Sequence, residues 1–399
     1  MPTLASKEKC TGCAACYNAC AHSAITMVED AEGFLVPKVD SSKCVECKLC
    51  EMSCPVTIPL KIWGMPTPKT FALISERDRR GSSSGGAFSA FARIMLENGG
   101  VVYGAAFDKK LHCHHIEIQN IKDLPSLRGS KYVQSEVGDV FKRVKTNLIS
   151  GRKVLFCGTP CQVAGLKNFL RKPYTNLLTL DLICHGVPSD MIYQSYLKKI
   201  SSRFAAFPDG YEFRNRNGWG FTPSISVCGK FRRIYGVDAL FMEAFNASAI
   251  FRKCCYSCPY SGLPRVGDCT LGDFWGIGRY GKPFKYDTMK GVSLVLANTE
   301  VGEAAMRLLK DCYIEERTLE EALIENHNLN EPSKLPSNRD NIIRDFLNPK
   351  MTLKVIDTKY NLVDHSLKAT VKNVASRLGL FSIVKRVYNW YKVNSYGKA

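Results

Sequence analysis

Two runs of four cysteines with identical spacing stand in the first 54 residues of the chain. Each run reads C-x2-C-x2-C-x3-C, the spacing with which short loops hold cubane 4Fe-4S clusters. Three cysteines of such a run bind one cluster, and the fourth binds the cluster of the other run. The first cluster is therefore predicted to be bound by Cys10, Cys13, Cys16 and Cys54, and the second by Cys44, Cys47, Cys50 and Cys20.

The segment between the two runs predicts a small domain built around both clusters. Residues 24–27 and 34–39 alternate as paired strands do, and they flank a turn at 30–33. Residues 1–60 thus have the organisation of a two-cluster bacterial ferredoxin. A pair of zinc knuckles is the alternative, but all eight ligand positions are cysteine and their spacing differs from that of zinc sites.

Composition is that of a cytoplasmic globular protein with more than one domain. The 399 residues are long enough for two or three domains, and 45% of them are hydrophobic, which is an ordinary fraction. The first residues lack the apolar core of a secretory signal, and no apolar run reaches the length of a membrane span. The 18 cysteines are therefore expected to be reduced and to serve as metal ligands.

The formal net charge of +18 indicates an anionic partner without identifying it. Each oxidised cluster with its four thiolates contributes about −2, so the loaded protein is less basic than its sequence. Nucleic acid, anionic lipid, a phosphorylated cofactor and an acidic redox partner are all compatible with the charge that remains.

The last segment, 346–399, is predicted to be a basic amphipathic tail. It has no acidic residue after Asp364, and apolar residues between 380 and 391 recur on one helical face. Such a helix can lie on an anionic membrane, here the inner face of the cell membrane. The alternative is a helix that docks on its own protein or on a partner.

A Ser/Gly loop that follows the predicted head domain indicates an anion site. A strand at 70–75 precedes the loop, and an amphipathic helix and a second strand at 101–107 follow it. Backbone N–H groups at the start of such a helix suit the phosphates of a nucleotide or flavin. A flexible connector is the alternative. The loop residues are Ser82, Ser83, Ser84, Gly85 and Gly86.

Two smaller features precede the next predicted helix, at 136–150. Lys131 and Tyr132 belong to a basic and aromatic cluster, interpreted either as part of an anionic-cofactor site or as a solvated loop. The sequence HCHH at 112–115 is expected on a strand, where neighbouring side chains point to opposite faces. We therefore interpret these histidines as structural or exposed rather than metal-binding.

A βαβ unit is predicted from a strand at 153–158, a helix at 162–170 and a strand at 177–184. Parallel strands with a right-handed crossover place their GTPC and CHG motifs at one sheet edge, where ligands of open α/β sheets bind. A later C-x2-C pair can complete a third four-cysteine site. Its ligands would be Cys161, Cys184, Cys255 and Cys258. Buried structural thiols and a zinc site at the last pair are the alternatives.

Together these motifs resemble the coenzyme F-420 hydrogenase/dehydrogenase beta-subunit family. The resemblance covers about residues 1–345 and rests on RGSSSGGAF, GSKYVQS, GTPCQVAGLK, DLICHGVPS, CYSCPY and GDCTLGDFWG in this order. It implies an FAD protein that passes electrons between iron-sulfur clusters and a second substrate. Bacterial relatives with the same head often accompany polysaccharide biosynthesis genes, which implies a role in that process.

The resemblance also implies where the flavin is held, although it assigns no catalytic residue. The expected contacts come from the Ser/Gly loop, the Lys131 region, the GTPC and CHG motifs and the GDFWG turn. The expected flavin-binding residues are Ser82, Ser83, Ser84, Gly85, Gly86, Lys131, Tyr132, Gly158, Thr159, Pro160, His185, Gly272, Asp273, Trp275 and Gly276.

The expected fold is α+β or α/β, with a ferredoxin-like head at 1–60 and a mixed α/β flavin- and cluster-binding part at 70–150 and 151–345. The expected function is that of a cytoplasmic oxidoreductase in which a flavin converts single electrons into two-electron chemistry. Expected partners are a ferredoxin or reductase and a small-molecule or lipid-linked acceptor. A non-catalytic electron-transfer or scaffold subunit is the alternative, and a nucleic-acid-binding protein is a weaker third interpretation.

Overall fold

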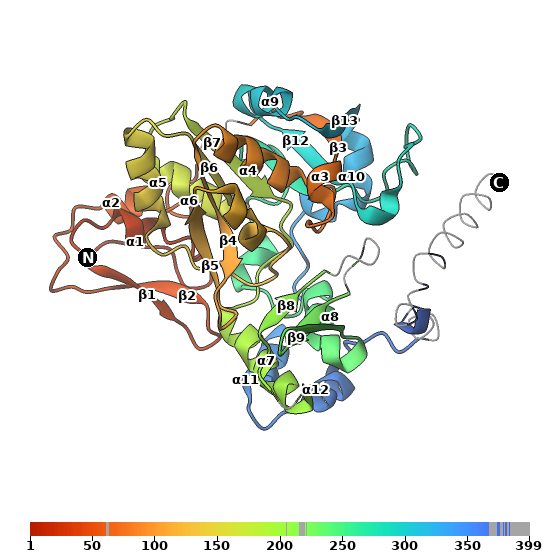
Figure 1. Cartoon of the computed structure of the whole chain (residues 1–399). Helices are drawn as coiled ribbons and strands as arrows, with labels where there is room; N and C mark the ends of the chain where they lie inside the picture. Colours follow the sequence, from red (N-terminus) through yellow and green to blue (C-terminus); the bar gives the residue numbers. More distant parts are fainter. Residues whose placement is uncertain are drawn as a thin grey trace.

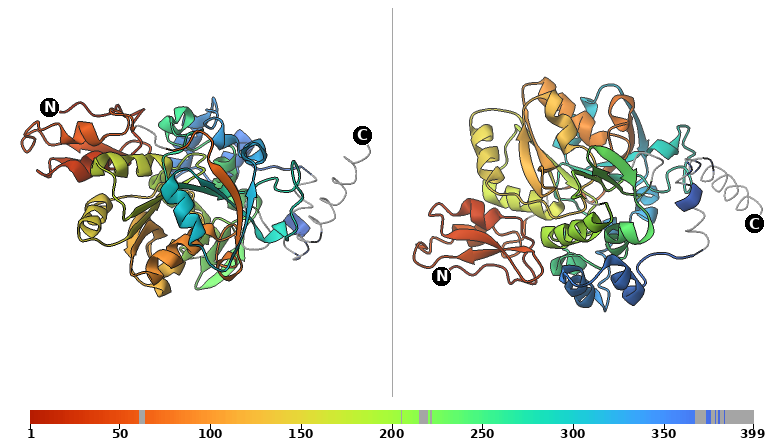
Figure 2. Two further views of the ribbon diagram at one scale, coloured as in Figure 1. Left: turned by 90° about the horizontal axis from the view of Figure 1, so that it is seen from above. Right: turned by 60° about the horizontal axis from the view of Figure 1, so that its bottom comes forward.

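The computed structural model describes residues 1–60, 64–204, 206–214, 220, 222–366, 373–375, 378, 380 and 383. They form an N-terminal head, a central sheet covered by helices, and a second lobe that lies below the sheet in Figure 1. Figure 2 shows that the head stands at one side of the other two parts. The predicted combination of a ferredoxin-like head with a mixed α/β part is confirmed.

The head consists of two short helices and a pair of strands. Its elements are α1 (Ala15–Ala19), β1 (Ile25–Glu29), β2 (Leu35–Val39) and α2 (Leu49–Ser53). β1 and β2 are antiparallel, as the alternation between the cysteine runs predicts. The residue before each helix has the left-handed conformation, with φ of 60° at Ala14 and 58° at Lys48. The two cysteine runs therefore fold into the same local structure.

Eight strands of the described chain form the central sheet. In spatial order they are β13 (Cys312–Arg317), β3 (Lys69–Ser75), β12 (Ser293–Ala297), β11 (Cys269–Asp273), β7 (Leu177–Leu182), β6 (Val154–Gly158), β4 (Val101–Phe107) and β5 (Cys113–Ile118). β4, β6, β7 and β11 are parallel, and the strands outside them pair antiparallel. Because central parallel strands are buried on both faces, their sequences are mainly apolar, and the polar Thr179 and Asp181 of β7 are fully buried. The segments 70–150 and 151–345 thus share one sheet.

Helices cover both faces of this sheet. α4 (Ala87–Glu97) and α9 (Glu300–Arg307) bury apolar side chains on one face. α5 (Val140–Ile149) and α6 (Pro160–Leu170) bury apolar side chains on the other face. Alternate residues of β4 and β6 point to opposite faces, so these two strands contribute to both cores. The shorter helices and 3-10 turns of this part are α3 (Glu76–Arg79), η1 (Ile121–Leu127), η4 (Thr288–Lys290), α10 (Leu319–Glu325) and η5 (His327–Leu329).

The second lobe packs around a core rich in aromatic side chains, among them Tyr193, Tyr196 and Phe241. The sequence analysis did not anticipate its separate three-stranded sheet. Within the described residues, its elements are α7 (Asp190–Phe204), β8 (Gly210–Glu212), β9 (Ser224–Val227), β10 (Lys230–Arg233), η2 (Gly236–Ala239), α8 (Leu240–Asn246), η3 (Lys253–Ser257), α11 (Arg339–Leu347) and α12 (Leu353–Tyr360).

Two predicted helices differ from the structure. The helix expected at 136–150 begins only at Val140, because Glu136 pairs with β5 through its backbone. The tail expected at 346–399 begins within α11, and Leu353 and Ile356 of the next helix, α12, belong to the lobe core. Most of the amphipathic helix expected at 380–391 lies outside the described residues. None of the helices in the described part of the chain is long and apolar enough to cross a membrane.

Candidate functional site

The head gathers its eight cysteines into two groups of four around two small cavities. The inner group lines a cavity of about 20 Å³ and consists of Cys10, Cys13, Cys16 and Cys54. The outer group lines a cavity of the same size and consists of Cys20, Cys44, Cys47 and Cys50. The structure thus places the fourth cysteine of each run with the first three of the other run.

The surroundings of these thiols fit iron-sulfur clusters. Burial raises the pKa of Cys13 to about 12, with a smaller contribution from the charges of Cys10 and Cys54, although hydrogen bonds from Ala15 and Thr11 act in the opposite direction. A thiolate here needs a compensating cation, which cluster iron supplies. The Gly12 N–H donates to Cys10 Sγ at 3.4 Å. No three Cys, His, Asp or Glu side chains among the described residues are arranged around a single metal ion, whereas a cubane binds each thiolate to a separate iron.

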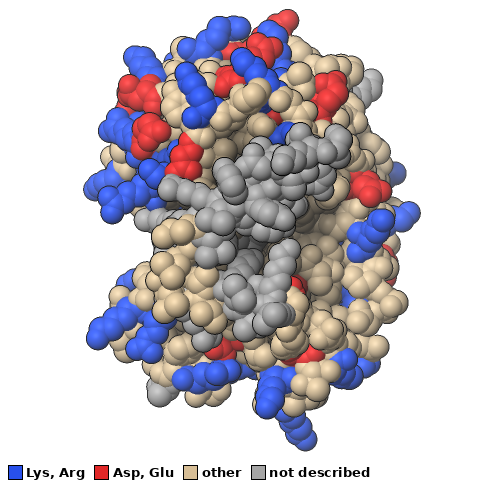
Figure 3. Space-filling model, turned by 90° about the vertical axis from the view of Figure 1, so that its right-hand side faces the viewer, with Lys and Arg blue, Asp and Glu red and all other residues tan. Residues whose placement is uncertain are grey.

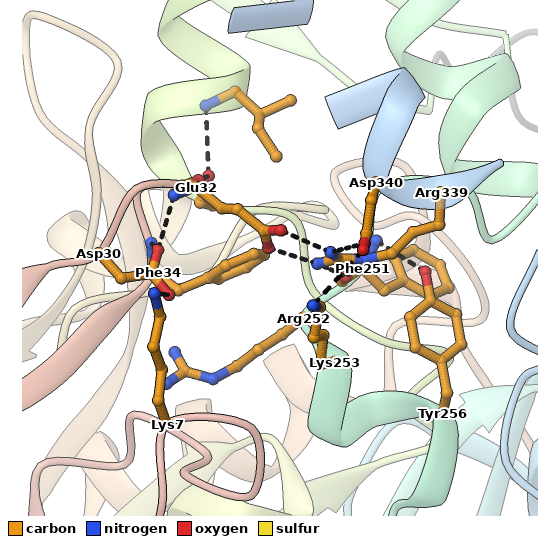
Figure 4. Close-up of polar contacts among 12 residues, drawn as sticks. Lys7, Asp30, Glu32, Phe34, Phe251, Arg252, Lys253, Tyr256, Arg339 and Asp340 are labelled. Carbon is orange, nitrogen blue, oxygen red and sulfur yellow. Dashed lines mark hydrogen bonds and ion pairs between the residues drawn. The ribbon is translucent and has the colours of Figure 1, made fainter. Parts of the chain in front are cut away.

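Two arginines fix the head to the rest of the protein, and Figure 4 shows the contact of one of them, Arg339, with Glu32. Arg252 donates to the backbone oxygens of Cys10 at 2.6 Å and Leu35 at 3.1 Å. Arg339 donates to both carboxylate oxygens of Glu32 at 2.7 Å. Because one of these contacts is made to the inner cysteine run itself, the position of the inner group relative to the sheet domain is fixed.

The outer group is the more accessible of the two. Cys47 is exposed, and Val45 beside it is 59% exposed. In contrast, Cys10, Cys13 and Cys16 are buried. A molecule in solution therefore has better access to the outer group than to the inner one.

A third group of cysteines forms at the carboxyl edge of the sheet. Cys161 lies in the first turn of α6, Cys184 follows β7, and Cys258 follows η3. Burial and the nearby thiolates of Cys258 and Cys184 raise the pKa of Cys161. Burial and Cys258 raise the pKa of Cys184 to about 12. The structure therefore brings together residues that lie far apart in the sequence.

The fourth position of this group is shared by two neighbouring residues. A hydrogen bond with Cys254, burial and the nearby Cys184 raise the pKa of Cys255. Cys254 in turn is close enough to Cys258 and Cys10 to contribute to their raised pKa values, after the larger effect of burial. C-x2-C spacing singled out Cys255, but Cys254 also reaches the group and lies toward the head.

The inner and third groups adjoin each other across α6. Cys13 is among the residues whose charge raises the pKa of Cys161, after burial and the nearer cysteines. Gly165 lies one helical turn beyond Cys161, on the same face of α6. A Cβ atom at Gly165 would be 2.9 Å from Cys13 Sγ. Glycine at this position therefore permits the close approach of α6 to the inner group.

A cavity of about 290 Å³, here called the main cavity, opens beside the third group. Cys161 and Cys184 form part of its wall. The N-terminus of α4 and the ends of β6, β7 and β11 meet there. Twelve of the expected flavin-binding residues also line it: Ser82, Ser83, Ser84, Gly86, Lys131, Tyr132, Gly158, Thr159, His185, Gly272, Asp273 and Trp275.

Three expected flavin-binding residues lie outside this wall. A Cβ atom at Gly85 would lie 2.1 Å from Leu73 O, so this glycine serves the packing of the loop on β3. Pro160 is the first residue of α6 and is buried there. Gly276 has φ of 76° and packs against the ring of Tyr280, so it serves a turn.

Two of the polar groups that the sequence analysis did not place in the main cavity are Arg214 and His115. Arg214 reaches it from the second lobe, where it donates to Asp273 at 2.5 Å and lies over the Trp275 ring at 5.5 Å. His115 lies on β5, with Nδ1 2.8 Å from Ser135 Oγ. The interpretation of His115 as structural agrees with these contacts. No sequence signal links Arg214 to the cavity, because a separate folded lobe carries it there.

His115 is expected to make stability depend on pH. Its ring stacks on Phe156 at 5.4 Å and its Nε2 is 3.1 Å from Cys157 O. Burial lowers the pKa of His115 from 6.5 to about 4, so the folded protein holds the ring neutral. The neutral ring contributes fully to the free energy of unfolding above pH 6.5, the pKa of histidine in the unfolded chain. As pH falls from 6.5 toward 4, the free energy of unfolding should decrease by up to about 3 kcal/mol.

Anaerobic urea unfolding at several pH values between about 5 and 7 measures this effect as the slope of the unfolding free energy against pH. His115→Gln can keep both hydrogen bonds without a charge, so its slope should be smaller than that of the wild type. His114→Gln changes the partly exposed neighbour and should keep the wild-type slope. Equal slopes for all three proteins would contradict the assignment.

Comparison with known proteins identifies two parts of the chain. Residues 9–58 match the family model of the 4Fe-4S dicluster domain. Residues 151–322 match the family model of the C terminus of the coenzyme F420 hydrogenase/dehydrogenase beta subunit. The chain carries both of these domains. It is an iron-sulfur redox protein related to that beta subunit, and the resemblance seen in its motifs is confirmed over these residues.

Among solved structures, a chain of the F420-reducing NiFe hydrogenase complex from Methanosarcina barkeri, studied by xenon derivatization, is similar to this protein. The identity is 14% and the TM-score 0.45, with 70% of this chain and 92% of that chain covered. Similarity at this level assigns neither an activity nor a partner to this chain. Curated proteins gave no match.

Proposed function

We propose that the protein is an iron-sulfur flavoprotein oxidoreductase. The observation that carries this proposal is the shared wall of the third cysteine group and the main cavity, to which Cys161 and Cys184 both belong. Cofactors that share a wall can exchange electrons directly. The outer, inner and third groups then form one path from the exposed end of the head to the cavity.

The main cavity suits a flavin, with FAD as the expected form. Ser84, Gly86 and Ala87 place the start of α4 at its wall, where backbone N–H groups are suited to phosphate. Trp275 and Phe245 supply apolar ring surface on other sides. A flavin bound there would supply the exchange between one-electron and two-electron chemistry. The protein contributes the binding surface and holds the third group against it.

A non-catalytic electron-transfer subunit is the second candidate, favoured by the exposure of Cys47 and by a head fixed to the body. Several expectations stay predictions: a ferredoxin or reductase as partner, a lipid-linked acceptor, peripheral membrane contact and a role in polysaccharide biosynthesis. Nucleic acid is not favoured. Figure 3 shows one face on which Lys and Arg side chains are interspersed with Asp and Glu.

Cofactor analysis after anaerobic purification tests the proposal. Bound FAD that is reduced through the clusters is the expected result. Intact clusters without any affinity for added flavin would favour the electron-transfer subunit instead.

Ser84→Leu is expected to weaken FAD binding about tenfold or more, since overfilling a packed site costs roughly 1–3 kcal/mol. The Ser84 hydroxyl donates to Val292 O at 2.9 Å. Ser84→Ala loses the same hydrogen bond without adding volume, so it is the matched control and should stay within about threefold of the wild type. FAD titration followed by fluorescence measures both variants. Equal affinities for Ser84→Leu and Ser84→Ala would place the flavin elsewhere.

A further inference from the structure

Arg265 carries a charge that is buried next to the third cysteine group. It lies in the segment between Cys258 and β11, and its side chain is 1% exposed. A buried guanidinium is stable only where its N–H donors have acceptors. The acceptors of its five N–H groups are Thr270 Oγ1, Asp181 Oδ1 and the backbone oxygens of Tyr260, Gly262 and Leu182.

The guanidinium joins two segments that carry ligands of this group. Nη1 donates to Tyr260 O at 2.7 Å, two residues after Cys258. Nη2 donates to Leu182 O at 2.8 Å, two residues before Cys184. Because the guanidinium is planar and rigid, these hydrogen bonds fix the two segments relative to each other.

Asp181 holds the guanidinium from the side of the sheet. Its Oδ1 atom lies 3.1 Å from Arg265 Nη2, and its Oδ2 atom accepts a hydrogen bond from Gly267 N at 2.8 Å. A Cβ atom at Gly267 would lie 2.7 Å from Asp181 N, so glycine permits this approach. The folded chain therefore holds both partners of the ion pair in place.

The charge of Arg265 acts on the thiolates of the third group. Burial and neighbouring thiolates raise the pKa of Cys184 and of Cys258, and the guanidinium opposes this effect at both residues. Asp181 acts together with burial at Cys184, but its effect is smaller than that of Arg265. The ion pair as a whole therefore acts on Cys184 as a cation.

A fixed charge near a cluster changes how readily that cluster accepts an electron. Reduction adds one negative charge, which burial disfavours and a nearby cation favours. The reduction potential of an iron-sulfur cluster depends on such charges, on hydrogen bonds and on solvent exposure. Arg265 supplies such a cation to the third group.

We propose that Arg265 is a positioning residue of the third group, which holds two of its ligand segments together and raises the reduction potential of its cluster. This proposal rests on the part of the proposed function that assigns a cluster to this group. With Arg265 in place, the cluster beside the main cavity accepts electrons from the head more readily.

A redox titration of the anaerobically purified full chain, monitored by EPR, tests the proposal. The signal of the third cluster is the one that Cys161→Ser lacks. Arg265→Gln should shift the reduction equilibrium of this signal about tenfold toward the oxidised cluster, or about 59 mV for one electron. Asp181→Asn removes the opposite charge and should shift the same equilibrium several-fold toward the reduced cluster. Loosened packing alone does not produce shifts of opposite sign.

Two controls separate the charge from the structural role. Arg265→Lys keeps the charge but loses the planar fork, so its potential should stay near the wild-type value while a chelator removes iron from the third group faster. Arg317→Met breaks another buried ion pair, that with Glu321, on a strand separated from β7 by β3, β12 and β11. It should leave the potential of the third cluster unchanged.

Equal potentials for Arg265→Gln and the wild type, or shifts of the same sign for Arg265→Gln and Asp181→Asn, would overturn the proposal. If Arg265→Gln does not fold, an unchanged potential in Asp181→Asn overturns it instead. In these cases about 12 iron atoms in the wild type would leave the proposed electron path intact. About 8 iron atoms, with no signal lost in Cys161→Ser, would contradict that path and this proposal together. The two failures are therefore distinguishable.

Discussion

Replacing Cys161 with serine is expected to remove one whole cluster from the protein. Anaerobically purified wild-type protein should contain about 12 iron atoms per chain and the Cys161→Ser variant about 8. The serine hydroxyl is a poor substitute for a thiolate ligand, and the third group would lose its cluster. The head retains all eight of its cysteines, so its two clusters should persist. Iron and sulfide analysis, together with EPR of the reduced protein, measures the change.

Cys312→Ser is the matched control for this loss. Cys312 is a partly buried cysteine at the start of β13 and belongs to none of the three groups. Its replacement should leave about 12 iron atoms in place. Cys184→Ser should behave like Cys161→Ser. A full iron content in both Cys161→Ser and Cys184→Ser would show that the third group holds no cluster.

The same measurement decides between the two vicinal cysteines. Cys255 has the C-x2-C spacing to Cys258 and lies near Cys184. Cys255→Ser is therefore expected to lose about 4 iron atoms, and Cys254→Ser to lose none. The reverse result would assign the ligand to Cys254, on the side of the group that adjoins the head.

Local spacing and strand order explain how much of the site the sequence predicts. The head follows from the cysteine spacing, because three ligands of each cluster lie within one short loop and the fourth is the last cysteine of the other run. Cys161 and Cys184 are predictable for a different reason: β6 and β7 are adjacent parallel strands, so the segments after them lie at one edge. Both predictions depend on contacts within or between neighbouring elements.

Contacts between distant parts of the chain explain what the sequence does not predict. Arg214 reaches the main cavity because the part of the second lobe from α7 to η3 is inserted between β7 and β11, next to the sheet edge. Gly85 belongs to a loop that was predicted to bind phosphate, but its missing side chain serves the packing on β3 and β12. A Ser/Gly sequence cannot separate these two roles, since both require a residue without a Cβ atom.

The junction between the head and the lobe also depends on such a contact. Arg339 on α11 is 1% exposed and lies 307 positions from its partner Glu32. Its Nε also donates to Phe251 O at 2.9 Å. Hydrogen bonds to Glu32 and the charge of that carboxylate outweigh burial, so the pKa of Arg339 is raised and the guanidinium stays charged. No local pattern predicts this pair.

Arg339→Met is expected to destabilise the docked head by about 3–5 kcal/mol, because it leaves Glu32 without its bidentate partner in a partly buried position. Anaerobic hydrogen exchange should show faster exchange in β1 and β2, and reduction of the third group through the head should slow as Cys13 moves away from α6.

Arg344→Met is the matched control. Arg344 lies on the same helix but is exposed, and the hydrogen bond described for its side chain is the one to Asn341. It should leave both quantities near their wild-type values. If the two variants behave alike, the contact between Arg339 and Glu32 does not hold the head in place, and the path from the inner to the third group must depend on Arg252 and the α6 interface instead.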